Sequence, residues 1–169
     1  SELTGRLLDG GIRSLALIGG REEFIVTKNR LLGFDDAFVK RPDWNGSRQT
    51  FLNVDTDREV EKIVEKLLAE QTECIVCMDD FLCGCVLNVM QTRQVAVPGQ
   101  VQVVSFYDSS LLANRTPSVT SIRFDVEGLG KTACGTLLKM LDGEAAQGRT
   151  LLGYEVRMRE STKSFPRSY

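Results

Sequence analysis

Short apolar runs alternate with amphipathic stretches along most of this chain. Six runs rich in apolar or β-branched residues predict strands, at residues 14–18, 50–54, 74–78, 101–106, 119–123 and 154–158. Four further stretches predict helices, at residues 24–38, 58–69, 80–91 and 126–141. Strands that alternate with helices of this length predict an α/β fold, with a mainly parallel sheet and helices on both of its faces.

The size, composition and charge of the chain narrow the function classes. A length of 169 residues suits one ordinary domain, and 42% hydrophobic with 26% charged residues is the balance of a soluble globular protein. The chain has 21 basic and 23 acidic residues, so its formal net charge is −2. This charge argues against a nucleic-acid-binding surface in this segment. No apolar run approaches the ~20 residues of a membrane span. Residues 1–6 show no signal-peptide core, so we expect a cytoplasmic protein without membrane contact.

The cysteine and histidine content argues against an enzyme, a metal site and a cofactor. The Cys74-x-x-Cys77 spacing occurs in redox and zinc sites. Both cysteines lie in the apolar run 74–78, however, and no second such pair exists, which favours small buried thiols. The chain has no histidine, which removes any catalytic pairing of serine or cysteine with histidine. We therefore predict that the protein is not an enzyme and that it binds neither a metal nor a cofactor.

Polar loops follow four of the predicted strands. They comprise residues 19–24, 55–57, 79–80 and 105–110. Ligands bind beyond the carboxyl ends of the strands in an open parallel sheet, so these loops are the expected place of a cleft. Their carboxylates accept hydrogen bonds from hydroxyl groups, which suits a sugar or a nucleoside. For Asp57, Asp80 and Asp125, helix capping is the favoured interpretation. For Asp79 and the loop at Tyr107, a structural role (helix capping or turn formation) and ligand binding are equally well supported.

Two other ligand classes fit poorly. Gly19-Gly20-Arg21 follows a strand, but it forms neither of the glycine-rich patterns that bind phosphates. A divalent-metal site like that of a receiver or phosphatase domain needs a lysine at a strand end, and none is evident.

Five motifs, in order and with matching spacing, resemble those of the LacI/GalR family of bacterial transcription regulators. They are residues 14–20 with 29–34 (similar to IALIGG and RLxGF), 74–84 (AIxxxND…G), 97–106 (VPxDVxVVGF), 117–130 (PxLTTV…D…G) and 159–162 (RxST). Together they extend over nearly the whole chain.

The resemblance implies a truncated periplasmic-binding-protein-like fold (type I), which has two lobes joined by crossing strands. Residues 1–122 would form the C-terminal lobe, residues 123–153 a segment of the N-terminal lobe, and residues 154–169 the return strand and a loose C-terminal tail. The helix-turn-helix and most of the N-terminal lobe would lie outside this chain. DNA would then be a partner only through a headpiece that this chain lacks.

The resemblance also assigns ligand-binding residues. Arg30 matches the arginine of RLxGF, which commonly contacts the effector, and Asp79 matches a polar position after the third strand. Tyr107 stands where the family has a ligand-binding aspartate, and Asp108 matches the aspartate that follows it. A tyrosine stacks on a sugar ring but cannot accept two hydrogen bonds as a carboxylate does, which argues against a standard hexose.

Phe24 and Asp55, in the loops after the first two strands, complete the predicted site. The family often places an aromatic residue near the position of Asp55, and none is evident here.

The resulting hypothesis is the effector-sensing domain of a homodimeric DNA-binding repressor. A small polar ligand (a sugar, a sugar derivative or a nucleoside-like compound) would bind between the lobes and change their closure, and with it the affinity for DNA. The alternative is a periplasmic sugar-binding protein of a transport system, which shares the fold. An enzyme on a doubly wound sheet is a further rival, which the absence of histidine disfavours.

Overall fold

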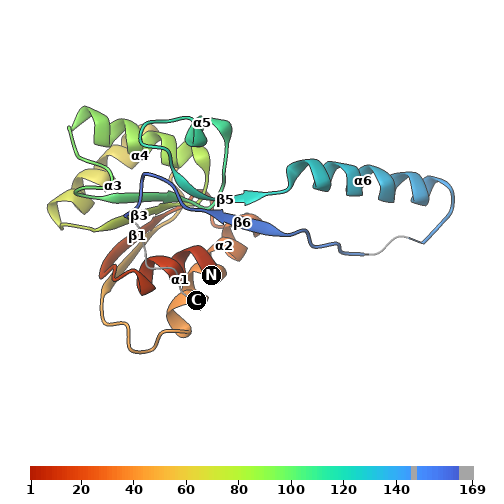
Figure 1. Ribbon diagram of the computed structural model, residues 1–169, viewed down its shortest axis with the longest axis horizontal. Helices are drawn as coiled ribbons and strands as arrows, with labels where there is room; N and C mark the ends of the chain where they lie inside the picture. The colour runs from red at the N-terminus through yellow and green to blue at the C-terminus, as the bar shows by residue number, and fades with distance from the viewer. Residues whose placement is uncertain (146–147, 164–169) are drawn as a thin grey trace.

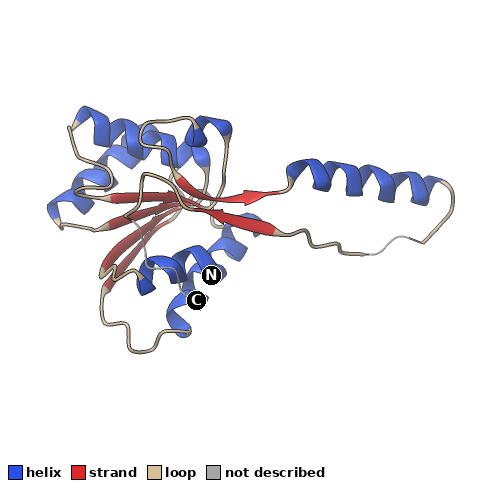
Figure 2. Cartoon of the chain, in the orientation of Figure 1, coloured by secondary structure: helices blue, strands red, loops and turns tan. Residues whose placement is uncertain are grey.

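A six-stranded sheet with helices on both faces forms the body of the molecule (Figure 2). The structure is a computed structural model, and it describes residues 1–145 and 148–163. The strands are β1 (Ser14–Ile18), β2 (Ser47–Phe51), β3 (Cys74–Cys77), β4 (Gln102–Ser105), β5 (Thr120–Phe124) and β6 (Tyr154–Arg157). The helices are α1 (Glu2–Asp9), α2 (Ile25–Val39), α3 (Asp57–Ala69), α4 (Asp80–Thr92), α5 (Ser110–Ala113) and α6 (Val126–Leu141).

The strand order is β2-β1-β3-β4-β5-β6, and every neighbouring pair except β5 with β6 is parallel. The prediction of an α/β fold with a mainly parallel sheet is therefore confirmed. Because β1 and β4 enter the sheet on either side of β3, the chain winds in both directions from the centre, as in doubly wound folds.

Two apolar clusters, one on each face of the sheet, hold the helices in place (Figure 1). Helices α3, α4 and α5 cover one face and α1 and α2 cover the other. The central strand β3 is fully buried and contributes to both clusters, with Ile75 and Cys77 on one side and Cys74 and Val76 on the other. Burial on both faces explains why this strand is a continuous apolar run in the sequence.

The position of Cys74 and Cys77 on opposite faces decides between the two interpretations of their spacing. Two residues three apart in a strand point in opposite directions, so these thiols cannot share a metal or form a disulfide with one another. Both are buried, and burial raises the pKa of each thiol above its ordinary value. They are small apolar core residues in this fold.

One predicted strand is displaced. The apolar run 50–54 predicted a strand there, but β2 spans Ser47–Phe51, so the prediction is wrong by three residues. The reason is that β2 is the edge strand and pairs with β1 from Ser14↔Ser47 to Ile18↔Phe51. Backbone pairing with β1, rather than the apolar pattern, decides where an exposed edge strand begins. The four-residue helix α5 was not predicted either.

Helix α6 lies apart from the rest of the molecule (Figure 1). It has the predicted bounds, and the Asp125 side chain caps it by accepting a hydrogen bond of 2.9 Å from the Gly128 amide. No residue of α6 is buried, and Leu129 and Leu137 are more than half exposed. The chain reaches the helix from β5 and comes back to the sheet at β6.

The division of the chain into residues 1–122, 123–153 and 154–169 stays a prediction. The tail at residues 164–169, which was expected to be loose, lies outside the described residues. Among the helices of residues 1–145 and 148–163, none combines the length and the apolar composition that a membrane span requires.

Candidate ligand-binding cleft

Arg30 is a half-buried guanidinium at the carboxyl edge of the sheet. It lies on α2, which begins after the loop that follows β1. Burial lowers the pKa of Arg30, and the neighbouring Asp79, Tyr107 and Asp80 act in the opposite direction. Within residues 1–145 and 148–163, Arg30 makes no hydrogen bond or ion pair through its side chain. Its donors are therefore available to a ligand.

A cavity of about 210 Å³ opens beside Arg30. Its lining residues come from α1, α2, β5, β6 and the end of β4: Ser1, Glu2, Asn29, Arg30, Gly33, Phe106, Ile122, Phe124 and Tyr154. The volume is below the roughly 300–1,000 Å³ of a complete small-molecule site.

Tyr107 follows the end of β4, and the Ser105 side chain forms two hydrogen bonds with its backbone. The Ser105 hydroxyl donates to the Tyr107 carbonyl at 2.7 Å, and the Tyr107 amide donates to the Ser105 hydroxyl at 3.1 Å. The Tyr107 ring stacks on that of Phe124 in β5, with centroids 6.4 Å apart and planes inclined by 28°. Phe124 lines the cavity beside Arg30, so the Tyr107 ring stacks on a residue of the cavity wall without lining the cavity itself.

Asp79 caps α4. Its Oδ1 accepts a hydrogen bond of 2.8 Å from the Leu82 amide, which satisfies one of the free amides at the start of that helix. A cap uses one carboxylate oxygen and leaves the other free to bind, so capping and ligand binding are compatible here. Asp80, within the first turn of α4, does not cap it.

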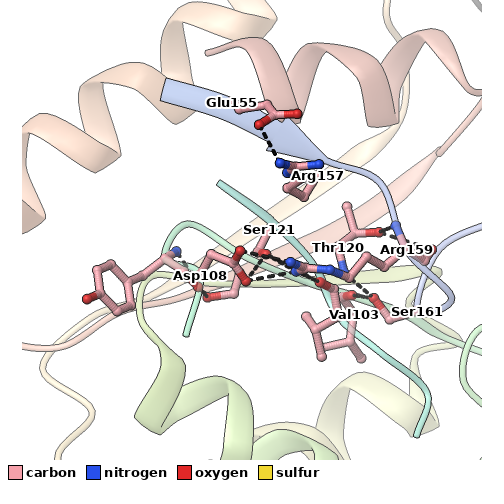
Figure 3. Close-up of polar contacts among 11 residues, drawn as sticks. Val103, Asp108, Thr120, Ser121, Glu155, Arg157, Arg159 and Ser161 are labelled. Atoms are coloured by element: carbon pink, nitrogen blue, oxygen red, sulfur yellow. Dashed lines mark hydrogen bonds and ion pairs between the residues drawn. The ribbon is translucent and has the colours of Figure 1, made fainter. Parts of the chain in front are cut away.

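Asp108 is held by Arg159, from the segment after β6 (Figure 3). The guanidinium donates from Nη1 to Oδ1 and from Nη2 to Oδ2, each at 2.8 Å, and the Ser121 hydroxyl also donates to Oδ1 at 2.8 Å. Burial acts to raise the pKa of Asp108, but the hydrogen bonds from Arg159 and Ser121 and the charge of Arg159 outweigh it and lower that pKa. With only 8% of its side chain exposed, Asp108 has both oxygens engaged within the protein.

The other two predicted residues lie at exposed positions away from this cavity. Asp55 pairs with Arg21 at 3.2 Å, with half of each side chain exposed, and Phe24 is 54% exposed. Neither lines the cavity beside Arg30. Of the predicted residues only Arg30 lines this cavity. Asp79 and Tyr107 lie close enough to Arg30 for their charges to act on its pKa, whereas Phe24 and Asp55 do not belong to that group.

Sequence reasoning missed Phe124 and Tyr154 of the cavity, and it gave no role to Arg159. Phe124 and Tyr154 face each other across the β5–β6 pairing, which depends on the course of the chain after α6. For Arg159 a signal existed, since it opens the RxST motif, but the motif does not say which residue the arginine meets. No group of three or more candidate metal ligands occurs in the part of the chain that the structure describes.

The doubly wound sheet, the cleft at its carboxyl edge and the strand that returns antiparallel define a periplasmic-binding-protein-like lobe. The chain belongs to the family of the periplasmic binding protein-like domain, whose model matches residues 4–162. Within it, the chain corresponds to the C-terminal effector-domain part of LacI/GalR-type regulators, which confirms the resemblance seen in the motifs.

The relatives are transcription regulators rather than enzymes. Catabolite control protein A of Staphylococcus aureus (strain MRSA252) is 23% identical over 163 residues, which cover 96% of this chain and 50% of that protein. The HTH-type transcriptional repressor PurR of Aliivibrio fischeri is 24% identical over 143 residues, or 82% of this chain and 42% of that protein. This chain therefore spans about half the length of the curated relatives that it matches.

Solved structures agree with the fold. The transcription regulator CcpA of Lactococcus lactis superposes with a TM-score of 0.84 at 24% identity, over 96% of this chain and 60% of that one. The transcription regulator GntR of Chromobacterium violaceum gives a TM-score of 0.81 at 26% identity, over 95% and 60% of the two chains.

Proposed function

We propose that this chain is the effector-sensing part of a bacterial DNA-binding transcriptional repressor. The effector is a small polar molecule (a sugar, a sugar derivative or a nucleoside-like compound) that binds between this lobe and a second one. The observation that supports the proposal most directly is Arg30, a half-buried arginine that lines a cavity and whose guanidinium has no hydrogen-bond or ion-pair partner among the described residues.

Each of the clustered residues has a role in this proposal. Arg30 donates hydrogen bonds to the ligand, Asp79 accepts one with the oxygen that does not cap α4, and Tyr107 stacks on a ring of the ligand. Phe24 and Asp55, which lie outside the cavity beside Arg30, remain predicted ligand contacts. Closure of a second lobe would bring the ligand close enough for them to contact it.

Regulation follows from lobe closure. The only described connections between the sheet and α6 are β5 and β6, which supports the assignment of the segment 123–153 to the far lobe in this proposal. A ligand that binds the closed form better shifts the population toward it. In a homodimer that change alters the spacing of two DNA-binding headpieces, and so the affinity for an operator. The protein would work in the cytoplasm and without a cofactor.

A periplasmic binding protein of a transport system shares this fold and is the alternative. The relatives reported above carry the names of transcription regulators, which favours the regulator.

The test is a ligand screen on the complete gene product. Hexoses, hexose phosphates, nucleosides and free purine bases are each added at 1 mM while the melting temperature is followed. One class should raise the melting temperature by roughly 5–10 °C, because saturation at a hundred times Kd stabilises the protein by about 2.7 kcal/mol.

The matched variants are Arg30→Met and Arg58→Met. Arg30→Met should abolish the shift, whereas Arg58→Met, which changes an exposed arginine of α3, should keep it. A screen without any shift, or an unchanged shift in Arg30→Met, would contradict the proposed function.

A further inference from the structure

The loop that carries Tyr107 is tied to two other segments of the chain by one buried ion pair. Arg159 holds both oxygens of Asp108, and its Nη1 also donates to the Val119 carbonyl and to the Ser121 hydroxyl, each at 2.7 Å. The pair therefore joins the loop after β4, strand β5 and the segment after β6. Only 19% of the Arg159 side chain and 8% of that of Asp108 are exposed.

The backbone of Tyr107 lies between two fixed points. On one side, the buried Ser105 hydroxyl bonds both the amide and the carbonyl of Tyr107. On the other side, the next residue is Asp108. Its partner Ser121 lies three positions before Phe124, the residue on which the Tyr107 ring stacks. The contacts of Asp108 thus connect the residue next to Tyr107 with the strand that carries its stacking partner.

We propose that Arg159 is a positioning residue of the ligand cleft: by holding Asp108 against β5, it fixes the Tyr107 ring on Phe124 beside Arg30. Asp108 then acts through Tyr107 and does not touch the ligand itself. A ring held in place before binding loses less conformational freedom when a ligand stacks on it, which favours affinity. The importance of Tyr107 for a ligand rests on the proposed function, but the position of its ring can be measured without one.

The experiment uses the three tyrosines of the chain, Tyr107, Tyr154 and Tyr169. The protein is labelled with 3-fluorotyrosine, and each ¹⁹F resonance is assigned from a Tyr→Phe variant. Arg159→Lys keeps the charge but cannot bond both carboxylate oxygens in parallel, as a planar guanidinium does. It should shift or broaden the Tyr107 resonance, and Asp108→Asn should do the same.

The matched control is Glu160→Gln. Glu160 joins the same segment to the residues before β5, since the Ser118 amide and hydroxyl donate to it at 2.9 and 3.0 Å, but among the described residues no hydrogen bond or ion pair joins it to the Tyr107 loop. It should leave the Tyr107 resonance in place. Fluorescence of Trp44, the single tryptophan, reports whether each variant is folded.

An unchanged Tyr107 resonance in folded Arg159→Lys and Asp108→Asn would overturn the inference, even if both variants melt earlier, because Arg159 would then serve stability alone. If Arg159→Lys does not fold, Ser121→Ala takes its place, since it removes only one hydroxyl that bonds Asp108. A negative ligand screen with a displaced Tyr107 resonance would contradict the proposed function and leave the positioning role standing.

Discussion

Arg159 and Asp108 lie 51 positions apart in the sequence and form two parallel hydrogen bonds of 2.8 Å each. This two-point geometry is the strongest form of an arginine–carboxylate contact. Because both side chains are largely buried, removing one partner leaves the other charge without compensation in the protein interior.

Asp108→Asn should therefore lower the free energy of unfolding at pH 7 by about 3 kcal/mol, equivalent to a melting temperature lower by roughly 6–12 °C. Urea unfolding measures the effect. The control is Asp55→Asn, which affects a half-exposed pair with Arg21 and should change stability by no more than about 0.5 kcal/mol. Equal losses in the two variants would show that burial of the Arg159–Asp108 pair is unimportant.

The same pair gives stability a defined pH dependence. The pKa of Asp108 is lowered in the folded protein, so its contribution is fully present above the pKa of an unfolded aspartate, about 3.9, and is lost as the pH falls through the lowered value. The stability difference between the wild type and Asp108→Asn should thus be constant from pH 5 to 7 and shrink below about pH 4. A difference that stays constant down to pH 2 would contradict this assignment.

Asp79 allows its two roles to be separated. Asp79→Ala should cost about 1 kcal/mol of stability, because the Leu82 amide loses its cap, whereas Asp79→Asn should cost much less, since asparagine caps helices equally well. Asp80→Ala, one residue further on, is the control and should have little effect. If Asp79 also accepts a hydrogen bond from the ligand, Asp79→Asn will weaken ligand binding while it keeps the melting temperature. If Asp79→Asn instead loses as much stability as Asp79→Ala, the charge of Asp79 rather than its capping hydrogen bond stabilises α4.

The exposed apolar face of α6 should make residues 1–169 self-associate. Val126, Leu129, Leu137 and Leu141 are all more than half exposed, and each large apolar side chain left in water costs roughly 1.5–3 kcal/mol. We predict a two-fold dimer with α6 in or beside the interface. Sedimentation equilibrium at micromolar concentration should show the dimer for the wild type and for the control Lys139→Glu, and a monomer for Leu129→Glu with Leu137→Glu. A monomeric wild type would contradict the prediction.

The isolated chain should not bind DNA specifically. Its net charge of −2 provides little attraction to phosphates. A gel-shift assay at physiological salt with operator fragments should retain no complex of residues 1–169 at micromolar concentration. The complete gene product serves as the positive control. Tight, sequence-dependent binding by residues 1–169 would overturn this prediction.

The parts of the fold that the sequence predicts are those in which burial dictates residue type. Strands β1 and β3 appear as apolar runs, and the bounds of α6 follow from an apolar repeat and the cap at Asp125. The edge strand β2 has no such signal, because its first residues, Ser47, Arg48 and Gln49, face solvent at least in part.

The same distinction holds for the cleft. Arg30, Asp79 and Tyr107 follow from the family motifs and from the rule that ligands bind beyond strand ends, since both place residues by their local position. The contacts of Asp108 with Arg159 and of Tyr107 with Phe124 join segments that are distant in the sequence. No local sequence pattern says which residues meet in these two contacts, so they could be found only in the folded chain.

The antiparallel pairing of β5 with β6 places Phe124 directly opposite Tyr154. Residues 125–153 therefore leave the sheet and return to it at adjacent positions. They connect β5 to β6 as a loop connects the two strands of a hairpin. A two-residue Asn-Gly turn is long enough to close such a pair of strands. Replacing residues 125–153 by that turn should therefore give a shortened protein whose sheet keeps its six strands, without the exposed apolar helix. Because the two strand ends are adjacent, we expect this end of the sheet to tolerate insertion of a folded unit whose own termini lie side by side.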